Sequence, residues 1–346
     1  MTPRRRLFAV FLFFLGACAP RASTVTPVAC EPTNRARGVE WSAEGLTRLR
    51  HVSDSLGTAA FVLVTDDRVV ASWGDTTHLY RIHSIRKSLM SALYGIYVEE
   101  GVIDTAATLA QLGIEEKGGL TEVERSARVV DLLRARSGVY IAAAGEVSSM
   151  REARPARHSH APNTFWYYNN WDFNVLGTIF RQETGEDIFA AFDSLVARPV
   201  GMQDFDASLG RYSLEETSVH PIYSTRMSAR DLARFGRLYL QGGCWNGRQV
   251  IPRDWARTST SLHSTTGDAG TKSGYGFMFW ITDPANADGI PTPSYTMSGA
   301  GGQRVTVFPE LNTVVVHLMD TDVRPRRTID SPEWDMMLRE LMKARR

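Results

Sequence analysis

The chain has 346 residues, of which 43% are hydrophobic and 22% charged; these are globular values, and the length suits one large domain or two ordinary ones. Its formal net charge is +1, and removal of residues 1–18, which hold three arginines and no acids, leaves 36 basic against 38 acidic residues. This balance gives no electrostatic reason for binding nucleic acid.

The N-terminus has the pattern of an export signal. An arginine cluster at residues 4–6 precedes an apolar run over residues 7–15, which is typical of a secretory signal rather than of a membrane span. Leu15-Gly16-Ala17-Cys18 resembles a bacterial lipobox, in which Cys18 is lipidated and becomes the mature N-terminus; simple cleavage near Ala19 is the alternative. We therefore expect a signal peptide over 1–18, a flexible tether over 19–38 and one folded domain over 39–346.

The first predicted elements of the domain are a β-hairpin and a helix. Two apolar runs rich in β-branched residues, 61–64 and 68–73, flank the polar pair Asp66-Asp67 and predict antiparallel strands. Apolar residues then recur at helical spacing, namely Ile85, Leu89, Ala92, Leu93, Ile96 and Tyr97, and Gly101 marks the end of the helix. Ser84 would lie at the helix N-terminus, where unpaired amides and the positive end of the dipole favour a developing alkoxide.

Ser84 and Lys87 form a Ser-x-x-Lys pair. Three-residue spacing puts both side chains on one face of a helix, so the lysine can accept the proton of the serine hydroxyl. The chain has only four lysines against 35 arginines, and a desolvated lysine, unlike an arginine, can become neutral and act as a base. The alternative is that Ser84 is an ordinary helix cap.

A second candidate stretch lies between Trp166 and Gly177. Its tyrosines and asparagines precede a helical pattern, Val175, Leu176, Ile179 and Phe180, and would direct polar groups from a loop into a cleft. The alternative is an aromatic cluster over the core, with the asparagines making a turn.

With these two stretches the chain resembles the serine β-lactamase-like hydrolases: class C β-lactamases, D-aminopeptidases, esterases and 6-aminohexanoate-dimer (nylon-oligomer) hydrolases. Ser84 to Lys87 matches the family's first motif, and Tyr168-Asn169-Asn170, followed by Phe173 and Leu176-Gly177, matches the second motif, Tyr-x-Asn. Tyr167 with Asn169 offers a competing register, but the distance to Leu176-Gly177 favours Tyr168. The resemblance runs from about residue 40 to the end, and several phrases are closest to the nylon-hydrolase branch.

The third motif of the family, Lys-Thr-Gly or a variant, is less clear. Lys272-Ser273-Gly274 has the right letters, but the aromatic strand that should precede the motif follows it, so we expect Lys272 in a surface loop. The better match is Met297-Ser298-Gly299-Ala300-Gly301-Gly302-Gln303, which precedes the strand 304–308. This version lacks the lysine that β-lactamases use to hold a substrate carboxylate, which favours esterase or amidase activity.

The resemblance implies an α/β (α+β) fold of the β-lactamase/transpeptidase type. Strands near 61–73, 275–281, 294–299, 304–308 and 313–319 would form one antiparallel sheet flanked by helices, and residues 102–265 a helix-rich second lobe. Ser84 would be the nucleophile, Lys87 the base and Tyr168 a proton relay, while Asn170, Ser298, Gly299 and Ala300 would bind the substrate and the oxyanion.

The implied function is a serine hydrolase that forms an acyl-enzyme on an ester or amide bond of a small molecule or peptide, with no cofactor. A true β-lactamase or a D-amino-acid peptidase is one alternative. The alternative of another class is a catalytically silent, tethered protein that binds cell-wall peptides. We expect the protein in the bacterial periplasm or on the outer membrane, with a membrane contact only through the N-terminal lipid.

The remaining cysteines and histidines suggest no metal site. Cys30 and Cys244 lack metal-ligand spacing; they could pair in an oxidising periplasm, but because one lies in the expected tether, we expect two independent thiols. His158-x-His160 could offer two imidazoles, but no carboxylate pair is near and three arginines precede it. The glycines at 299–302 precede a strand rather than a helix, so they do not form a phosphate loop.

Overall fold

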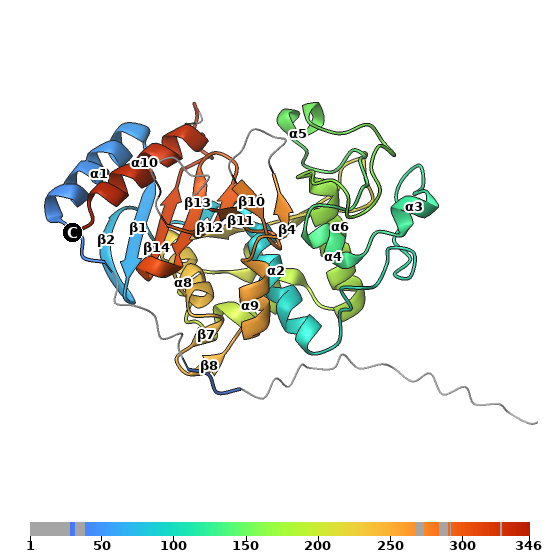
Figure 1. Cartoon of the computed structure of the whole chain (residues 1–346), viewed down its shortest axis with the longest axis horizontal. Coiled ribbons are helices and arrows are strands. Elements are labelled where there is room, and N and C mark those ends of the chain that lie inside the picture. Colours follow the sequence, from blue (N-terminus) through green and yellow to red (C-terminus); the bar gives the residue numbers. More distant parts are fainter. Residues whose placement is uncertain (1–27, 32–38, 267–272, 284–289, 291, 326) are drawn as a thin grey trace, which may run out of the picture.

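The fold is built on an eight-stranded antiparallel sheet whose members come from both ends of the chain (Figure 1). The computed structural model describes residues 28–31, 39–266, 273–283, 290, 292–325 and 327–346. The strand order across the sheet is β2 (Arg68–Gly74), β1 (Ala60–Thr65), β14 (Thr313–Leu318), β13 (Gln303–Phe308), β12 (Ser294–Gly299), β11 (Trp280–Thr282), β10 (Ser273–Tyr275) and β9 (Ser264–Thr265). The predicted N-terminal hairpin and its union with the C-terminal strands are confirmed.

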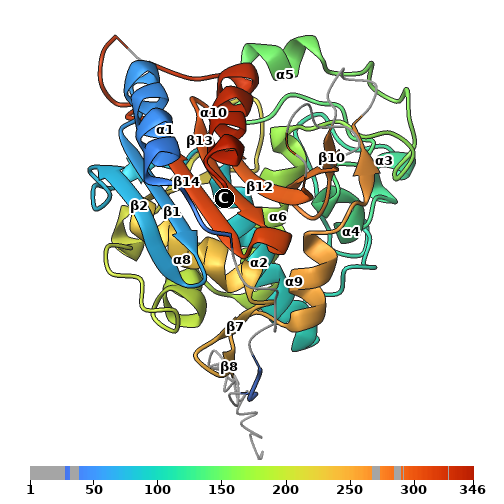
Figure 2. The same ribbon diagram turned by 60° about the vertical axis from the view of Figure 1, so that its left-hand side comes forward.

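Helices cover both faces of this sheet, as Figure 2 shows. The N-terminal helix α1 (Ala43–Leu56) and the C-terminal helix α10 (Ser331–Lys343) pack on one face, where Phe61, Val315 and Phe308 belong to a separate apolar cluster. On the other face lies α8 (Ala229–Leu240), and Gly236 brings this helix within van der Waals contact of Val314. Because both faces are covered, all six residues of β14 are buried, and four of the six are β-branched.

The helical part of the protein surrounds α2 (Ile85–Glu99), whose residues from Ile85 to Tyr97 are all buried. Its neighbours include α6 (Asn170–Thr184), α7 (Ile188–Phe192) and α9 (Arg253–Ser259). The other helices are α3 (Glu122–Arg125), α4 (Val129–Leu133) and α5 (Ser148–Glu152), and the short strands are β3 (Tyr80–Arg81), β4 (Arg211–Ser213), β5 (Ile222–Ser224), β6 (Arg226–Met227), β7 (Cys244–Trp245) and β8 (Arg248–Gln249). Most of these helices lie within residues 102–265, but α8, in the same span, packs on the sheet.

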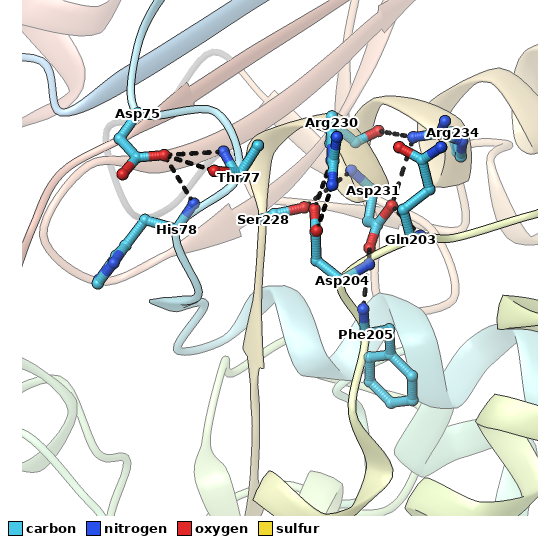
Figure 3. A network of polar contacts seen from close by, with 10 residues as sticks. All are labelled: Asp75, Thr77, His78, Gln203, Asp204, Phe205, Ser228, Arg230, Asp231 and Arg234. Atoms are coloured by element: carbon cyan, nitrogen blue, oxygen red, sulfur yellow. Dashed lines mark hydrogen bonds and ion pairs between the residues drawn. The ribbon is translucent and has the colours of Figure 1, made fainter.

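A buried carboxylate connects the start of α8 to a distant loop (Figure 3). Asp231 is fully buried and accepts hydrogen bonds from the backbone amides of Gln203, Asp204 and Phe205 at 2.9, 2.7 and 3.0 Å. Arg230 forms an ion pair with Asp204, and this pairing holds the pKa of the Asp204 carboxyl below its usual range. These contacts fix the backbone at Phe205, whose ring then packs edge-on against Phe192 in the helical part.

Cys30 and Cys244 form a disulfide with a Cα–Cα distance of 5.9 Å. The expectation of two independent thiols is therefore wrong. Residues 28–31 fall inside the expected tether, yet they add to the β7–β8 hairpin: Cys30 N donates to Gly247 O at 3.0 Å and Gln249 N to Val28 O at 2.9 Å. This backbone pairing brings the two thiols together across 214 positions of sequence.

Loss of this disulfide should lower stability without changing the site. Closing so long a loop removes much conformational entropy from the unfolded chain, so Cys30→Ala should lower the free energy of unfolding by about 2–5 kcal/mol. Denaturant titration under non-reducing conditions measures the change. Cys30→Ala/Cys244→Ala should cost little more than the single variant, and a reductant should affect only the wild type. Equal stability of wild type and Cys30→Ala would contradict a formed disulfide.

Candidate active site

Ser84 lies directly before α2, as expected, but it is not an ordinary cap. Its backbone is helical, with φ −74° and ψ −7°, and its side chain makes no capping hydrogen bond. The hydroxyl oxygen instead accepts a hydrogen bond from Lys87 Nζ at 3.1 Å. The capping alternative is therefore wrong, and the hydroxyl faces the lysine one turn along the helix.

The residue before Ser84 adopts an unusual backbone conformation. His83 has φ 48°, in the left-handed region that few residues other than glycine occupy. Its Nε2 lies 2.9 Å from the hydroxyl of Thr321, which follows β14. A strained turn held by a distant side chain is common at functional sites. Here it orients the entry to α2, and no pattern in the sequence indicates it.

Lys87 is the centre of the site. Its side chain is 1% exposed, and Nζ donates to Ser84 Oγ at 3.1 Å, to Tyr168 OH at 2.6 Å and to Asn170 Oδ1 at 3.0 Å. The rings of Tyr168 and Phe173 lie 4.1 and 4.4 Å from Nζ and exclude water from it. Burial, and then the charge of Arg86, lower the pKa of Lys87 well below its usual value. A lysine in this state can lose its proton and accept that of Ser84.

The second motif meets Lys87 in the register that the distance to Leu176-Gly177 favours. Tyr168, not Tyr167, contacts the lysine, while the Tyr167 hydroxyl donates to Met150 O at 2.6 Å and its ring packs against Tyr140. Burial raises the pKa of Tyr168 to about 12. The phenol is therefore protonated near neutral pH and can donate a proton, which leaves Lys87 as the base.

Asn170 belongs with Lys87 because Asn169 has another role. Asn169 caps α6, accepting from the Asp172 amide at 2.8 Å, so that Asn170 is the first residue of the helix and faces the site. Its Nδ2 donates to Gly145 O at 2.6 Å, which fixes the amide and leaves Oδ1 toward Lys87. Gly145 has φ 71°, which favours glycine at this position. The sequence gives no sign that Gly145 supports the site.

The third-motif candidate lies beside Ser84. A Cβ atom at Gly299 would be 2.3 Å from Ile82 O, so the end of β12 contacts the backbone just before the serine. Within the described part of the chain, neither the Ser84 nor the Ala300 amide donates a hydrogen bond to a backbone carbonyl in a turn or loop. Both amides are thus free to bind an oxyanion. Ser298 is half-buried on the same strand.

The cation missing from the third motif has a counterpart on the next strand. Met297, which stands where the family has lysine, is fully buried in the core. Arg304 of β13 is paired with Ser298, and its Nη1 donates to Gly299 O and Gln303 O, both at 3.0 Å. Burial lowers the pKa of Arg304 to about 10, so it stays charged. Lys272 lies outside the described residues.

Aromatic rings cover the site opposite Lys87. Trp280 of β11 lies 5.3 Å from the Tyr168 ring, centroid to centroid, and Trp166 lies 5.8 Å from Trp280. Tyr275 of β10 contacts all three rings. Trp166 and Trp280 are only half-buried and offer apolar surface next to the Tyr168 ring. Their gathering from separate segments was not predicted.

The remaining candidates from the sequence lie elsewhere. His158 is 3.6 Å from Glu124, while His160 stacks on Phe165 at 4.2 Å, so the two imidazoles do not act as a pair. Among the described residues no group of three or more histidines, cysteines or acids could hold a metal ion. Cys18 is outside the described residues. Of the helices that are described, none is long and apolar enough to cross a membrane.

Comparison with known proteins assigns the family. The family model described as Beta-lactamase matches residues 47–334, which hold both the sheet and the helical part. The chain therefore belongs to the β-lactamase family. It is similar to the 6-aminohexanoate-dimer hydrolase of Paenarthrobacter ureafaciens, with 23% identity over 90% of this chain and 85% of that protein.

Two further relatives agree with this assignment. A stretch covering 24% of this chain and 21% of the relative is 33% identical to esterase EstB of Burkholderia gladioli. D-alanine carboxypeptidase AmpC from Burkholderia cenocepacia has the same fold, with a TM-score of 0.63 and 14% identity over 87% of this chain and 98% of that one. The predicted fold and family are confirmed, and membership of this family makes the protein a hydrolase.

The two tyrosines allow a matched test of the site. Tyr168→Phe removes only the hydroxyl that contacts Lys87, so kcat should fall by roughly 100- to 10,000-fold, the range for one lost acid–base group. Tyr167→Phe loses the hydrogen bond to Met150 and should cost about 1 kcal/mol of stability while kcat stays near that of the wild type. Steady-state kinetics and thermal unfolding of both variants separate the two roles. The reverse result would move the motif by one residue.

Proposed function

We propose that the protein cleaves an ester or amide bond of a small molecule or short peptide through an acyl-enzyme on Ser84. The observation that carries this proposal is the buried cluster in which Lys87 contacts Ser84, Tyr168 and Asn170 at 2.6–3.1 Å. In the described chain no carboxylate lies within 4.0 Å of Lys87, so no salt bridge stabilises a charged lysine there.

The proposed reaction follows from the protonation states. Neutral Lys87 accepts the Ser84 proton as Oγ attacks the carbonyl carbon, and the amides of Ser84 and Ala300 stabilise the oxyanion. Protonated Tyr168 donates to the leaving alcohol or amine as the tetrahedral intermediate collapses, and it recovers a proton from Lys87, 2.6 Å away. A water molecule then attacks the acyl carbon by the same route, which releases the acid and restores Ser84.

The substrate class rests on the surroundings of Ser84. The half-buried rings of Trp166 and Trp280 favour an apolar group next to the scissile bond. Similarity to a 6-aminohexanoate-dimer hydrolase and, over a shorter stretch, to an esterase supports a linear amide or ester rather than a β-lactam. A β-lactamase or D-amino-acid peptidase is the second candidate, because Arg304 supplies a cation beside the third motif and the AmpC fold is shared.

Covalent labelling tests the nucleophile before the substrate is known. A fluorophosphonate probe should label the wild type at Ser84, and peptide mapping should locate the adduct. Ser84→Ala should abolish labelling, whereas Ser88→Ala should retain it, because the Ser88 hydroxyl is buried on the same helix and donates to Met278 O. Labelling that persists in Ser84→Ala would place the nucleophile elsewhere.

The same protein then separates the candidate activities. Turnover of nitrophenyl esters and of linear amides without turnover of nitrocefin supports an esterase or amidase. Rapid nitrocefin hydrolysis would favour the β-lactamase. No labelling and no turnover, together with binding of cell-wall peptides, would favour the silent, tethered protein.

We also propose that the chain is exported and lipidated at Cys18. The Cys30–Cys244 disulfide supports export, because disulfides persist in oxidising compartments. Expressed in a bacterium, the wild type should fractionate with membranes and incorporate an alkyne-labelled fatty acid. Cys18→Ala should lose the label, and Cys30→Ala should keep it. An unlabelled wild type with its N-terminus near Ala19 would support simple cleavage instead.

A further inference from the structure

Arg86, between Ser84 and Lys87 in the sequence, is a buried cation with no acid partner. Its side chain is 4% exposed, and within the described residues no carboxylate lies within 4.0 Å of it. Nη2 donates to Asn174 Oδ1 at 3.5 Å, and Nη1 has no hydrogen-bond partner. Some other arginines of the helical part pair with acids, for example Arg157 with Glu124. Burying an unpaired charge costs several kcal/mol, so the fold retains Arg86 against a substantial penalty.

The groups around Arg86 stabilise the charged guanidinium but supply no negative charge to pair with it. Its carbon lies 4.3 Å from the centre of the Tyr223 ring, whose electrons favour a cation. Asn174 is fixed in turn by donating to Ala144 O at 3.1 Å. Apolar side chains close the rest of the space, among them Phe205, which the Asp231 contacts hold in place.

The space beside Arg86 is too small for an anionic ligand. The cavity lined by Arg86, Tyr223 and Thr225 has a volume of about 10 Å³, which is close to the space one water molecule needs. A carboxylate or phosphate of a substrate would not fit. The charge of Arg86 therefore acts on the protein's own groups, which include Lys87, buried beside it at the start of the same helix, and Tyr168.

The groups that face Lys87 supply no negative charge. They are the hydroxyls of Ser84 and Tyr168, the amide of Asn170 and the ring of Phe173. Arg304 approaches from β13 and interacts with Tyr168. Asp172 is the buried acid of the same helix start, but burial raises its pKa to about 8, so it is mostly protonated at neutral pH. Like-charge repulsion from Arg86 is thus not offset.

We propose that Arg86 is a positioning residue whose unpaired buried charge keeps Lys87 in the neutral form that accepts the Ser84 proton. This inference rests on the proposed function. Two effects then act in the same direction: burial disfavours the charged lysine, and Arg86 disfavours it further. In this chain the residue between Ser84 and Lys87 that carries a positive charge, Arg86, therefore disfavours protonation of the catalytic lysine.

The pH dependence of catalysis tests the proposal. Activity requires neutral Lys87, so kcat/KM rises as pH increases through the pKa of Lys87. We call this rise of kcat/KM on the acidic side of the pH profile the acid limb. Removal of the positive charge in Arg86→Gln should raise the pKa of Lys87, so the midpoint of the acid limb should move to higher pH by on the order of one unit. At a pH below both limbs, kcat/KM would then fall about tenfold, while at high pH the two enzymes should converge.

Asn174→Asp is an independent test in which Arg86 remains. It changes almost no volume and places a carboxylate where the amide now accepts from Arg86 at 3.5 Å. The paired guanidinium would repel Lys87 less, so the acid limb should again move upward. Arg134→Gln is the control, because Arg134 also lies over an aromatic ring, that of Phe277, and does not contact the site. Its acid limb should equal that of the wild type.

The rate of fluorophosphonate labelling from pH 5 to 10 provides the readout, since it follows Ser84 activation without a known substrate. If the acid limb of the labelling rate stays at the wild-type pH in both Arg86→Gln and Asn174→Asp, or if the labelling rate falls by the same factor at every pH, the inference is overturned and Arg86 has a structural role. Failure of the wild type to label at Ser84 would instead refute the proposed function. Because Asn174→Asp keeps the arginine, the inference stays testable even where Arg86→Gln does not fold.

Discussion

Burial of the Lys87 side chain is the constraint on which the site depends. An exposed lysine would keep its proton near neutral pH and could not activate Ser84. Burial requires that α2 be enclosed on all sides, and α6, α9 and the sheet together provide this enclosure. The same enclosure raises the pKa of Tyr168 to about 12, so one physical effect gives the two neighbours opposite roles: a neutral base and a protonated acid.

The sheet topology brings the third part of the site to this helix. β1 pairs with β14, so the two ends of the chain close one side of the sheet, and β12 then ends beside the backbone at Ile82. The contact at Gly299 leaves no room for a side chain, which sets how closely the free amide of Ala300 can approach Ser84. The His83–Thr321 contact fixes the same junction from the far end of β14. The sheet and the helical part are therefore in contact at the residues directly before Ser84.

Charge is distributed around the site in an unusual way. The lysine of the family's third motif is replaced by buried Met297, yet two arginines, Arg86 and Arg304, lie close enough to influence Lys87 or Tyr168. Arg304 is held by two carbonyl groups at the edge of the site, whereas Arg86 is enclosed behind it. Both cations thus act on Tyr168, and Arg86 also acts on Lys87, so the absence of a third-motif lysine does not make the site poor in positive charge.

Local patterns in the sequence were enough to predict the elements whose contacts are close in the chain. The Ser84–Lys87 pair follows from helix geometry and the β1–β2 hairpin from its apolar runs. The family resemblance added the Tyr168 register, through the distance to Leu176-Gly177, and the joining of the N-terminal and C-terminal strands in one sheet. Tertiary structure alone decided the Cys30–Cys244 bond, the gathering of Trp166 and Trp280, and the isolation of Arg86. These features join residues that no periodicity relates, because pairing, burial and the absence of a counter-charge depend on which segments the packed chain brings together.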